Sequence, residues 1–503
     1  MTTQIKSVVV LGGGSAGFLS ALAFRATLPG VQVTVLHSSG IPAIGVGEST
    51  TRALPAFLHG PLGLERKAFY DAVRPIWKVG QRLDWGSPDR AHFNYPFDSF
   101  LTNKRPELPQ PNLYYCLHDM QDSGLSYSLM DQHRAPVFVD PAGRVTLVER
   151  FGYHIENQRF LNFLEQTAAD RGVEIIDGRV REVVQAENGD VETLRLEGGG
   201  EMGADVFVDC SGFRSVLLKE AMGEKYVSYA DALFADSAVV GSWRRDTPII
   251  PYTKANTMEH GWCWNIEFTE HITRGYVFSS AFCSDDVAVR ELREKNPKLG
   301  DDLRTIRFPS GRYENFWVRN VIGIGNASGF VEPLEATALQ LIVEQLRFVT
   351  KALIDSGGDP SPAMREFENH RYRARWDDVR DFLALHYKFN RQSDSAFWRH
   401  ARAETSLGGA RDFVDYYREA GPTILSLGMV GDRSIFGFDG YMNMLLGMKV
   451  PTERPPRLTD EEQAGWRKHQ ADVRARAGQA LTAEQALERF RQPDFDWNRL
   501  RIV

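Results

Sequence analysis

Three glycines near the N-terminus have the spacing of a site for the phosphates of a dinucleotide. Gly12, Gly14 and Gly17 form a Gly-x-Gly-x-x-Gly motif directly after residues 8–11 (VVVL), a run typical of a strand buried on both faces. The first glycine permits a tight turn, the second lets the backbone approach a pyrophosphate, and the third lets helix and strand pack closely. The motif therefore predicts a dinucleotide-binding site, with the phosphate charge at the N-terminus of the next helix.

The elements that must position this motif follow in the expected order. Residues 18–26 are rich in Ala and Leu and indicate a helix, and residues 31–36 indicate a second strand. Ser15 and Ala16, at the start of the helix, are further candidate cofactor contacts. An acidic residue usually ends the second strand and holds the ribose hydroxyls, but this chain has His37 there. Either His37 binds the ribose or the contact comes from elsewhere.

Later segments favour a flavin enzyme of the two-dinucleotide-binding type. Residues 204–209 and 320–325 indicate buried strands that end in small or polar residues, and residues 174–198 suggest a hairpin that turns at residues 188–190. A strand that returns to the sheet so late suits a flavin-binding α/β fold, although ordinary sheet strands are the alternative. We therefore predict an α/β fold of this type with an interleaved substrate region.

The C-terminal part is expected to be mostly helical. Residues 340–356 and 364–389 have apolar residues at helical spacing, and capping boxes at Thr459/Glu462 and Thr482/Gln485 begin two further helices. The domain prediction is an FAD-binding module at 1–74, 151–215 and 305–350, a substrate and tunnel region at 75–150 and 216–304, and a helical region at 351–503.

Composition narrows the classes of partner. The net charge of −7, from 59 basic and 66 acidic residues among 503, argues against nucleic acid. The four cysteines are far apart without a CxxC pair, so we expect no disulfide scaffold, no metal site and a cytoplasmic location. The uncharged stretch 7–24 contains the glycine cluster, so we interpret it as strand and helix and expect no membrane partner. The sequence leaves a homodimer open.

Several segments together resemble the flavin-dependent tryptophan halogenases. The order and spacing of these segments agree from residue 6 to about residue 450, and the PLE and WxWxI blocks are the most specific. The segments are GVGE at 45–48, PIWKVG at 75–80, GWCWNI at 261–266, FVEPLEATA at 330–338, DDVRDF at 377–382 and SAFW at 395–398.

The resemblance implies a reaction and roles for particular residues. FAD, reduced by a separate flavin reductase, would use O₂ and chloride or bromide to make hypohalous acid. Lys78 would present the halogen to an aromatic substrate, and Glu335 would stabilise and deprotonate the ring intermediate. Thr337 and Ala338 match positions whose backbone holds the halide. Further FAD contacts are expected at Val46, Glu48, Val180, Asn326 and Leu339.

Each of these residues also has a simpler interpretation. Lys78 taken alone is most often a surface lysine, and Glu335 alone would be a carboxylate that favours a helix N-terminus. Trp262 and Trp264 are expected along the tunnel between flavin and substrate, but alternating tryptophans on a strand also pack in cores.

The substrate prediction rests on aromatic residues and on a short C-terminal region. The segment 423–447 is shorter and has fewer polar groups than the segment that binds free tryptophan in the resembled family. This difference favours an indole, a larger aromatic natural product or a tryptophan within a peptide as the substrate. The candidate substrate contacts, which could equally pack loops, are Phe93, Tyr95, Phe97, Phe436 and Tyr441.

Three residues depart from the resembled family. Glu267 replaces the proline of WxWxIP, Ala336 replaces a serine beside the catalytic glutamate, and Ala338 replaces a glycine at the halide site. These departures keep two alternatives open. One is a flavin-dependent aromatic monooxygenase, which has no need of Lys78, and the other is a flavin-binding homologue that has lost halogenase activity.

Overall fold

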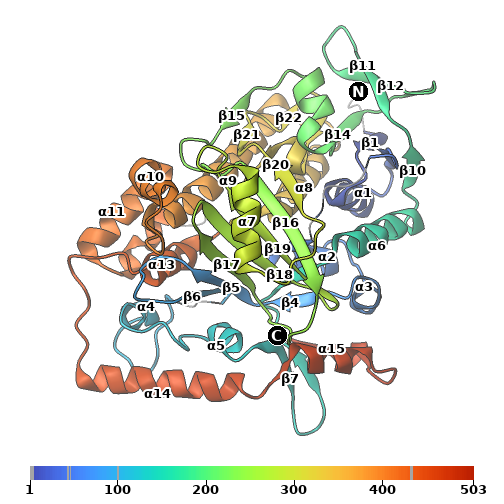
Figure 1. The fold of residues 1–503 in the computed structure, drawn as a ribbon. Coiled ribbons are helices and arrows are strands. Elements are labelled where there is room, and N and C mark those ends of the chain that lie inside the picture. Colours follow the sequence, from blue (N-terminus) through green and yellow to red (C-terminus); the bar gives the residue numbers. More distant parts are fainter. Residues whose placement is uncertain (1–4, 42–44, 46, 99–100, 431–433) are drawn as a thin grey trace. The chain divides into compact units, whose positions relative to one another are not determined.

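The computed structural model describes residues 5–41, 45, 47–98, 101–430 and 434–503 (Figure 1). Contacts divide the chain into two compact units, each assembled from three separate segments. The first unit contains Met1–Arg74, Ile155–Tyr229 and Phe308–Trp376, and the second contains Pro75–His154, Ala230–Arg307 and Asp377–Val503. The last segment, predicted as part of a separate helical region, is thus grouped with the substrate and tunnel segments.

A six-stranded sheet forms the centre of the first unit. Five of its strands are parallel, the sixth is an antiparallel edge strand, and β1 lies between β2 and β14. Val8, Val9 and Val10 are at most 3% exposed, which confirms the predicted strand buried on both faces. In spatial order the strands are β10 (Glu174–Asp177), β2 (Gln32–His37), β1 (Ser7–Leu11), β14 (Val206–Asp209), β23 (Val321–Gly323) and β22 (Trp317–Val318).

The predicted hairpin is correct in its turn and wrong in the first part of its first strand. β11 (Val180–Gln185) pairs antiparallel with β12 (Val191–Leu196), and Asn188 accepts from the backbone N–H of Asp190 at 2.9 Å within the turn. Residues 174–177 instead form β10, which pairs with β2 at the edge of the main sheet. The two isoleucines of β10 lie opposite apolar residues of β2, so pairing across the sheet prevails over the local hairpin pattern.

Helices cover the parallel sheet, and α1 (Ser15–Thr27) packs against α6 (Asn157–Asp170) and α8 (Ala338–Asp355). The remaining elements of this unit are α2 (Ala53–His59), α3 (Arg66–Val73), β3 (Glu48–Ser49), β13 (Glu201–Met202), β15 (Tyr226–Ser228), β21 (Gly311–Tyr313) and β24 (Gly329–Phe330).

A seven-stranded sheet forms the centre of the second unit. It is antiparallel except between β17 and β5, and Figure 1 shows α7 (Asp285–Lys295) across β16 and β19. In spatial order the strands are β20 (Arg304–Arg307), β16 (Ser237–Arg244), β19 (His271–Phe278), β18 (Gly261–Glu267), β17 (Thr253–Met258), β5 (Gly80–Asp84) and β6 (Phe93–Pro96).

The other elements of the second unit include the strand that carries Lys78. That strand, β4 (Ile76–Lys78), pairs antiparallel with β9 (Gly152–Ile155). Helix α9 (Pro362–Phe389) begins in the first unit and ends in the second. Other elements are β7 (Arg134–Val139), β8 (Val145–Leu147), β25 (Ala480–Thr482), β26 (Arg501–Ile502), α4 (Asn112–Cys116), α5 (Leu125–Asp131), α10 (Ala396–Glu404), α11 (Arg411–Ala420), α12 (Leu427–Val430), α13 (Gly437–Gly447), α14 (Asp460–Ala477) and α15 (Ala483–Arg491).

The two predicted capping boxes are confirmed at the starts of α14 and α15. The hydroxyl of Thr459 accepts from the N–H of Glu462, and that of Thr482 accepts from the N–H of Gln485, with the reciprocal bonds present in both. Within the described ranges, none of the helices is long and apolar enough to cross a membrane.

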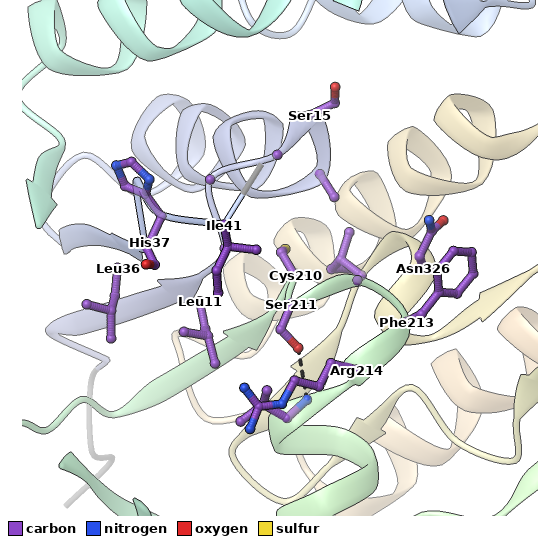
Figure 2. A pocket seen from close by; sticks show the side chains of 18 of the residues that line it. Leu11, Ser15, Leu36, His37, Ile41, Cys210, Ser211, Phe213, Arg214 and Asn326 are labelled. Carbon is purple, nitrogen blue, oxygen red and sulfur yellow. Dashed lines mark hydrogen bonds between the residues drawn. The ribbon is translucent and has the colours of Figure 1, made fainter. Parts of the chain in front are cut away.

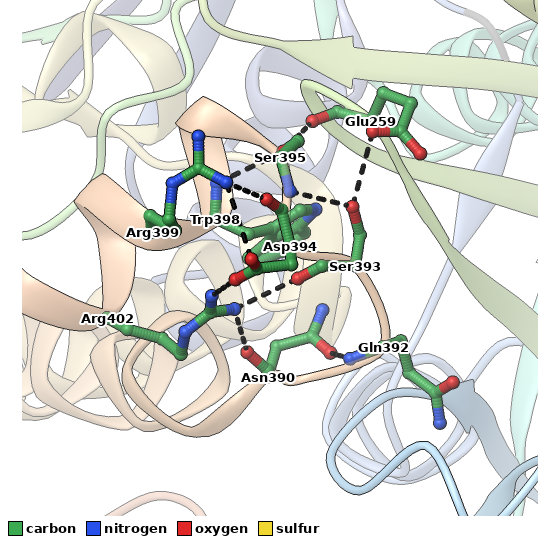
Figure 3. A network of polar contacts seen from close by, with 9 residues as sticks. All are labelled: Glu259, Asn390, Gln392, Ser393, Asp394, Ser395, Trp398, Arg399 and Arg402. Carbon is green, nitrogen blue, oxygen red and sulfur yellow. Dashed lines mark hydrogen bonds and ion pairs between the residues drawn. The ribbon is translucent and has the colours of Figure 1, made fainter.

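A polar network fixes the β17–β18 turn to the start of α10 (Figure 3). The Trp398 indole N–H donates to the carbonyl of Met258 at 2.7 Å. In Figure 3, the Ser395 hydroxyl donates to the carbonyl of Glu259. Arg402 donates to the carbonyls of Asn390 and Ser393 at 3.0 and 2.9 Å. The SAFW segment thus anchors the hairpin that carries Trp262 and Trp264.

Candidate functional site

A cavity of about 440 Å³ lies at the carboxyl edge of the parallel sheet in the first unit (Figure 2). Its walls include Leu11 and His37, at the ends of β1 and β2, and Cys210 and Ile324, which directly follow β14 and β23. From β1 the chain continues to β2 on one side, and β14, which comes much later in the chain, lies on the other side of β1. Such a point in a parallel sheet is where ligands bind in open α/β folds.

The three motif glycines have different reasons to be glycine. Gly12 has a φ of 125°, and a Cβ there would lie 2.3 Å from the carbonyl oxygen of Cys210. A Cβ on Gly17 would lie 1.8 Å from the carbonyl oxygen of Gly12. A Cβ on Gly14 would meet no atom of the described chain within 4 Å, so its backbone faces open space in the cavity. The turn therefore fits a pyrophosphate group such as that of FAD.

The end of β2 lacks an acidic ribose contact, and the structure places other polar groups there. His37 lines the cavity, and a Cβ on Gly13 would lie 2.8 Å from its ring. Asp177 pairs with His37 across the sheet, but it accepts from the backbone N–H of Ser39 at 3.0 Å and from its hydroxyl at 2.5 Å. These hydrogen bonds lower the pKa of Asp177. His37 and Ser38 therefore supply polar side chains at this end of the cavity.

Most residues predicted to contact the cofactor lie together around this cavity. Gly17 packs beneath the turn and is not among the described lining residues, and Val46 lies outside the described residues. The predicted residues that line the cavity are Gly12, Gly14, Ser15, Ala16, His37, Glu48, Val180, Asn326 and Leu339, and the predicted halide residue Ala338 joins them.

Several residues of the cavity wall were not predicted from the sequence. Arg179 precedes Val180, and Phe213 and Arg214 belong to the turn after β14. In Figure 2, Phe213 and Asn326 lie together on the side of the view opposite His37. The small residues at 210–212 marked this turn in the sequence, but not which side chains enter the cavity.

The GVGE segment brings a carboxyl group with an unusual pKa to the cavity. Glu48 is half-buried in the wall, and burial raises its pKa to about 7. A Cβ on Gly45 would lie 1.8 Å from the side-chain amide of Asn157 in α6, so this segment packs closely on that helix. A carboxyl group that titrates near neutrality is typical of functional sites.

Glu335 precedes a helix whose first turn lines the same cavity. Glu335 is 6% exposed and ends a short 3₁₀ turn, Pro333–Glu335. Ala336 then has a φ of 55°, in the left-handed region that favours glycine. Thr337 is buried just before α8, and its hydroxyl caps none of the described N–H groups of that helix. The first turn of α8 therefore offers backbone N–H groups and the positive end of the helix dipole, which suit an anion.

Lys78 is 1% exposed, so the interpretation as a surface lysine is wrong. Its ammonium lies 5.4 Å from the ring centroid of Phe97. On the neighbouring strand β9, Gly152 pairs with Lys78. A cation this close to an aromatic face is stabilised by the ring electrons.

Three of the candidate substrate residues gather around Phe382 of α9. The ring centroids of Tyr95, Phe436 and Tyr441 lie 6.1, 3.7 and 5.1 Å from that of Phe382. The Tyr441 hydroxyl donates to Asp378 at 3.0 Å. Phe382 was not among the predicted substrate contacts, because nothing in its local sequence shows which rings stack on it.

The other predicted aromatic residues are deeply buried. Phe93 is fully buried, and a Cβ on Gly447 would lie 2.2 Å from its ring. Trp262 and Trp264 are 1% and 4% exposed, with centroids 6.0 Å apart, and Gly275 leaves the space for the Trp264 indole. Close packing therefore surrounds Phe93 and both tryptophans.

The parallel sheet, its glycine turn and the cavity at its switch point define a class of protein, the nucleotide-binding proteins with an FAD-type α/β fold. Comparison with known proteins identifies the family within this class. The family model for tryptophan halogenase matches residues 7–464. This chain belongs to the tryptophan halogenase family and is an enzyme, a flavin-dependent halogenase.

Individual relatives match over nearly the whole chain. Tryptophan 7-halogenase RebH from Lentzea aerocolonigenes is 30% identical, covering 92% of this chain and 93% of that protein. Tryptophan 6-halogenase SttH from Streptomyces toxytricini is 31% identical, covering 95% and 96%. The crystal structure of MibH, described as a lathipeptide tryptophan 5-halogenase, superposes with a TM-score of 0.88 at 35% identity, covering 97% of this chain and 94% of that one.

Proposed function

We propose that this enzyme uses chloride or bromide to halogenate an electron-rich aromatic ring larger than free tryptophan. In this proposal hypohalous acid carries the halogen, Lys78 presents it, and Glu335 serves the ring intermediate. The observation that carries the proposal is the buried Lys78 beside the ring of Phe97, in a chain of the halogenase family. Burial takes this ammonium out of bulk water, which strengthens its interaction with any group brought beside it.

The residues around the cavity fit FAD, which a separate flavin reductase would deliver in its reduced form. When bound, reduced FAD supplies the oxidation of halide by O₂ to hypohalous acid. The N–H groups at the start of α1 would hold the pyrophosphate, with Gly14 leaving room for its approach. His37 and Ser38 are the polar side chains at the end of β2 that could bind a ribose.

Lys78 holds the halogen in one place. Its ammonium can donate a hydrogen bond to hypohalous acid, or its neutral amine can displace the hydroxyl group and carry the halogen as a haloamine with loss of water. Burial excludes bulk water from this step and strengthens the electrostatic interaction. A fixed donor of electrophilic halogen also restricts which ring carbon is attacked.

Glu335 would act on the cationic ring formed when the halogen adds. A carboxylate stabilises that positive charge and accepts the proton from the halogenated carbon, which restores the aromatic ring. The left-handed backbone of Ala336 fixes the direction of the chain between Glu335 and α8. Thr337 and Ala338, at the first turn of α8, would hold the halide through backbone N–H groups.

The aromatic cluster around Phe382 supports a substrate with an indole ring. Tyr95 and Phe436 offer aromatic faces, whereas the Tyr441 hydroxyl is engaged by Asp378. MibH, which resembles this chain at 35% identity, acts by its description on a lathipeptide. A tryptophan within a peptide, or a comparably large indole, is therefore the substrate class we propose.

The test is mass spectrometry of products formed with reductase, FAD, O₂ and either bromide or chloride. The substrate panel contains indole, a phenol, free tryptophan and a tryptophan-containing peptide. We expect the product to carry bromine or chlorine according to the salt supplied. A product that gains oxygen regardless of halide would identify a monooxygenase, and FAD binding without any product would identify an inactive homologue. Free tryptophan outcompeting the other substrates would refute the proposed substrate class.

A further inference from the structure

A buried histidine without an assigned role shares a strand face with Lys78. His154 lies in β9, is 1% exposed, and pairs with Ile76 of β4, while Gly152 pairs with Lys78. Residues two apart on a strand point to the same side of the sheet, so His154 and Lys78 are diagonal neighbours. The Cα atoms of such neighbours in an antiparallel pair are roughly 7–8 Å apart. Gly152 places no side chain between them. His154 is therefore positioned to influence the Lys78 side chain directly.

Hydrogen bonds on both ring nitrogens define the tautomer of His154. The backbone N–H of Glu267 donates to Nδ1 at 3.4 Å, so Nδ1 carries no proton. The proton of the neutral ring is then on Nε2, which lies 2.8 Å from the hydroxyl oxygen of Thr253 and donates to it. A proton on Nδ1 would point at the N–H of Glu267. The arrangement therefore accepts the neutral ring and disfavours the imidazolium.

The charges around His154 support the same form. Burial, the Lys78 ammonium and the Arg245 guanidinium together hold the pKa of His154 well below its usual value. The carboxylate of Glu267 is engaged elsewhere, because it forms an ion pair with Arg245 at 2.6 Å and accepts from Asn265 at 2.6 Å. Its charge is therefore committed to Arg245 and leaves the imidazole neutral.

We propose that Glu267 and Thr253 lock His154 as the neutral Nε2–H tautomer, and that His154 is a positioning residue for Lys78. The ring would support the lysine side chain without adding a second positive charge that repels an electrophilic halogen. The lock depends on the backbone N–H of Glu267, because a proline at this position would have no N–H to donate. The inference rests on the proposed function for the role of Lys78, but the tautomer can be tested without it.

The first test is NMR of the full-length enzyme labelled with ¹⁵N in its histidines, with His154→Gln used to assign the signal. We expect an unprotonated Nδ1 and a protonated Nε2 whose shifts stay constant between about pH 8 and about pH 5.5, across the usual titration of histidine. Glu267→Gln keeps the backbone N–H and should give the same spectrum. Glu267→Pro should give a mixture of tautomers. A wild-type ring that titrates near pH 6.5, or that carries its proton on Nδ1, would overturn the lock.

The second test measures the fraction of oxidised halide that ends in the product. His154→Ala should lower this fraction about tenfold through misplacement of Lys78, with FAD affinity unchanged. His154→Gln places an uncharged N–H donor near Thr253 and should stay within about twofold of wild type, since positioning needs no proton transfer. A normal fraction in His154→Ala, or equal damage in both variants, would overturn the positioning role. The proposed role of Lys78 is tested by a different variant. Halogenation that persists in Lys78→Ala would refute that role, whatever the His154 variants show.

Discussion

The cavity of the first unit differs from the surroundings of Lys78 in the second unit. The difference is whether the groups that would meet a ligand belong to the backbone or to side chains. In the cavity, the groups suited to an anion belong to the backbone, at the glycine turn and at the first turn of α8, which has no side-chain cap. The surroundings of Lys78 are made of side chains, with the half-buried ring of Phe97 near its ammonium and the buried His154 on the neighbouring strand. A backbone site is damaged when atoms are added to it, whereas a side-chain site is damaged when polar groups are removed. The predictions below use this difference.

The largest effect is expected from Lys78→Ala. Removal of the amine should lower product formation by about 10³-fold or more, while FAD affinity stays at the wild-type value because the cavity is untouched. Liquid chromatography of the product and a fluorescence titration of FAD measure the two quantities. Lys67→Ala is the matched control, since Lys67 is an exposed lysine paired with Asp71. Equal loss of FAD affinity and product would contradict the separation of the two regions.

Glu335→Gln should have the next largest effect. The amide keeps the shape of the side chain but accepts no proton, so kcat should fall about a hundredfold with little change in KM. Steady-state kinetics on the best substrate of the panel measures both constants. The exposed Glu366, paired with Arg373, provides the control variant Glu366→Gln. A higher KM at normal kcat would show that Glu335 only binds substrate.

Two alanine substitutions in the glycine motif should have different effects, one on FAD affinity and the other on the stability of the fold. Gly14→Ala should fold normally and bind FAD about tenfold or more weakly, because its Cβ would enter the open space of the cavity. Gly17→Ala should instead destabilise the fold by about 2–3 kcal/mol, because its Cβ would overlap the Gly12 carbonyl. Thermal unfolding and FAD titration distinguish them. Wild-type FAD affinity in Gly14→Ala would contradict a phosphate site at this turn.

Glu48→Gln should change how stability depends on pH. The pKa of Glu48 is about 7 in the folded chain, above the ordinary value of 4.5, so the wild type loses stability as pH rises from the lower value to the higher. Without added FAD, the variant should therefore be about 2 kcal/mol more stable above pH 7, allowing for partial exposure, and equal near pH 4. Urea unfolding at several pH values measures this difference. Parallel curves for the two proteins would refute the raised pKa.

Tyr441→Phe should have the smallest effect. It removes the hydrogen bond to Asp378 and keeps the ring beside Phe382, so stability should fall by about 1 kcal/mol and kcat should hardly change. Chemical unfolding and kinetics on the same preparation measure both. A large fall in kcat would show that the Tyr441 hydroxyl acts on the substrate. The aromatic cluster around Phe382 would then depend on a polar side-chain group, as the surroundings of Lys78 do.

The cavity was largely predictable because its determinants are local. The Gly12–Gly17 turn, the strands at 8–11 and 204–209, and the start of α8 near Glu335 are all specified by short stretches of sequence. The first strand of the predicted hairpin was assigned wrongly because the partner of β10 is β2, more than a hundred residues earlier in the chain. Local patterns show that a strand exists and leave its partner open.

The side-chain contacts in the second unit could not be predicted in the same way. Glu267 stood out as a departure, yet its partners His154 and Arg245 come from distant segments of the chain. Phe382 likewise receives rings from β6 and α13 that only the folded chain brings together. Such contacts depend on tertiary packing, which a single sequence does not display.

The proposal that Lys78 delivers the halogen is tested most directly by following the halogen in the Lys78→Ala variant. One reaction, with reductase, FAD, bromide and a reagent that traps free hypohalous acid, yields both the trapped halogen and the halogenated substrate. We expect the variant to oxidise bromide at the wild-type rate and the halogen to appear in the trap, with almost none in the substrate. Substrate halogenation at the wild-type rate in this variant would contradict the claim that Lys78 delivers the halogen.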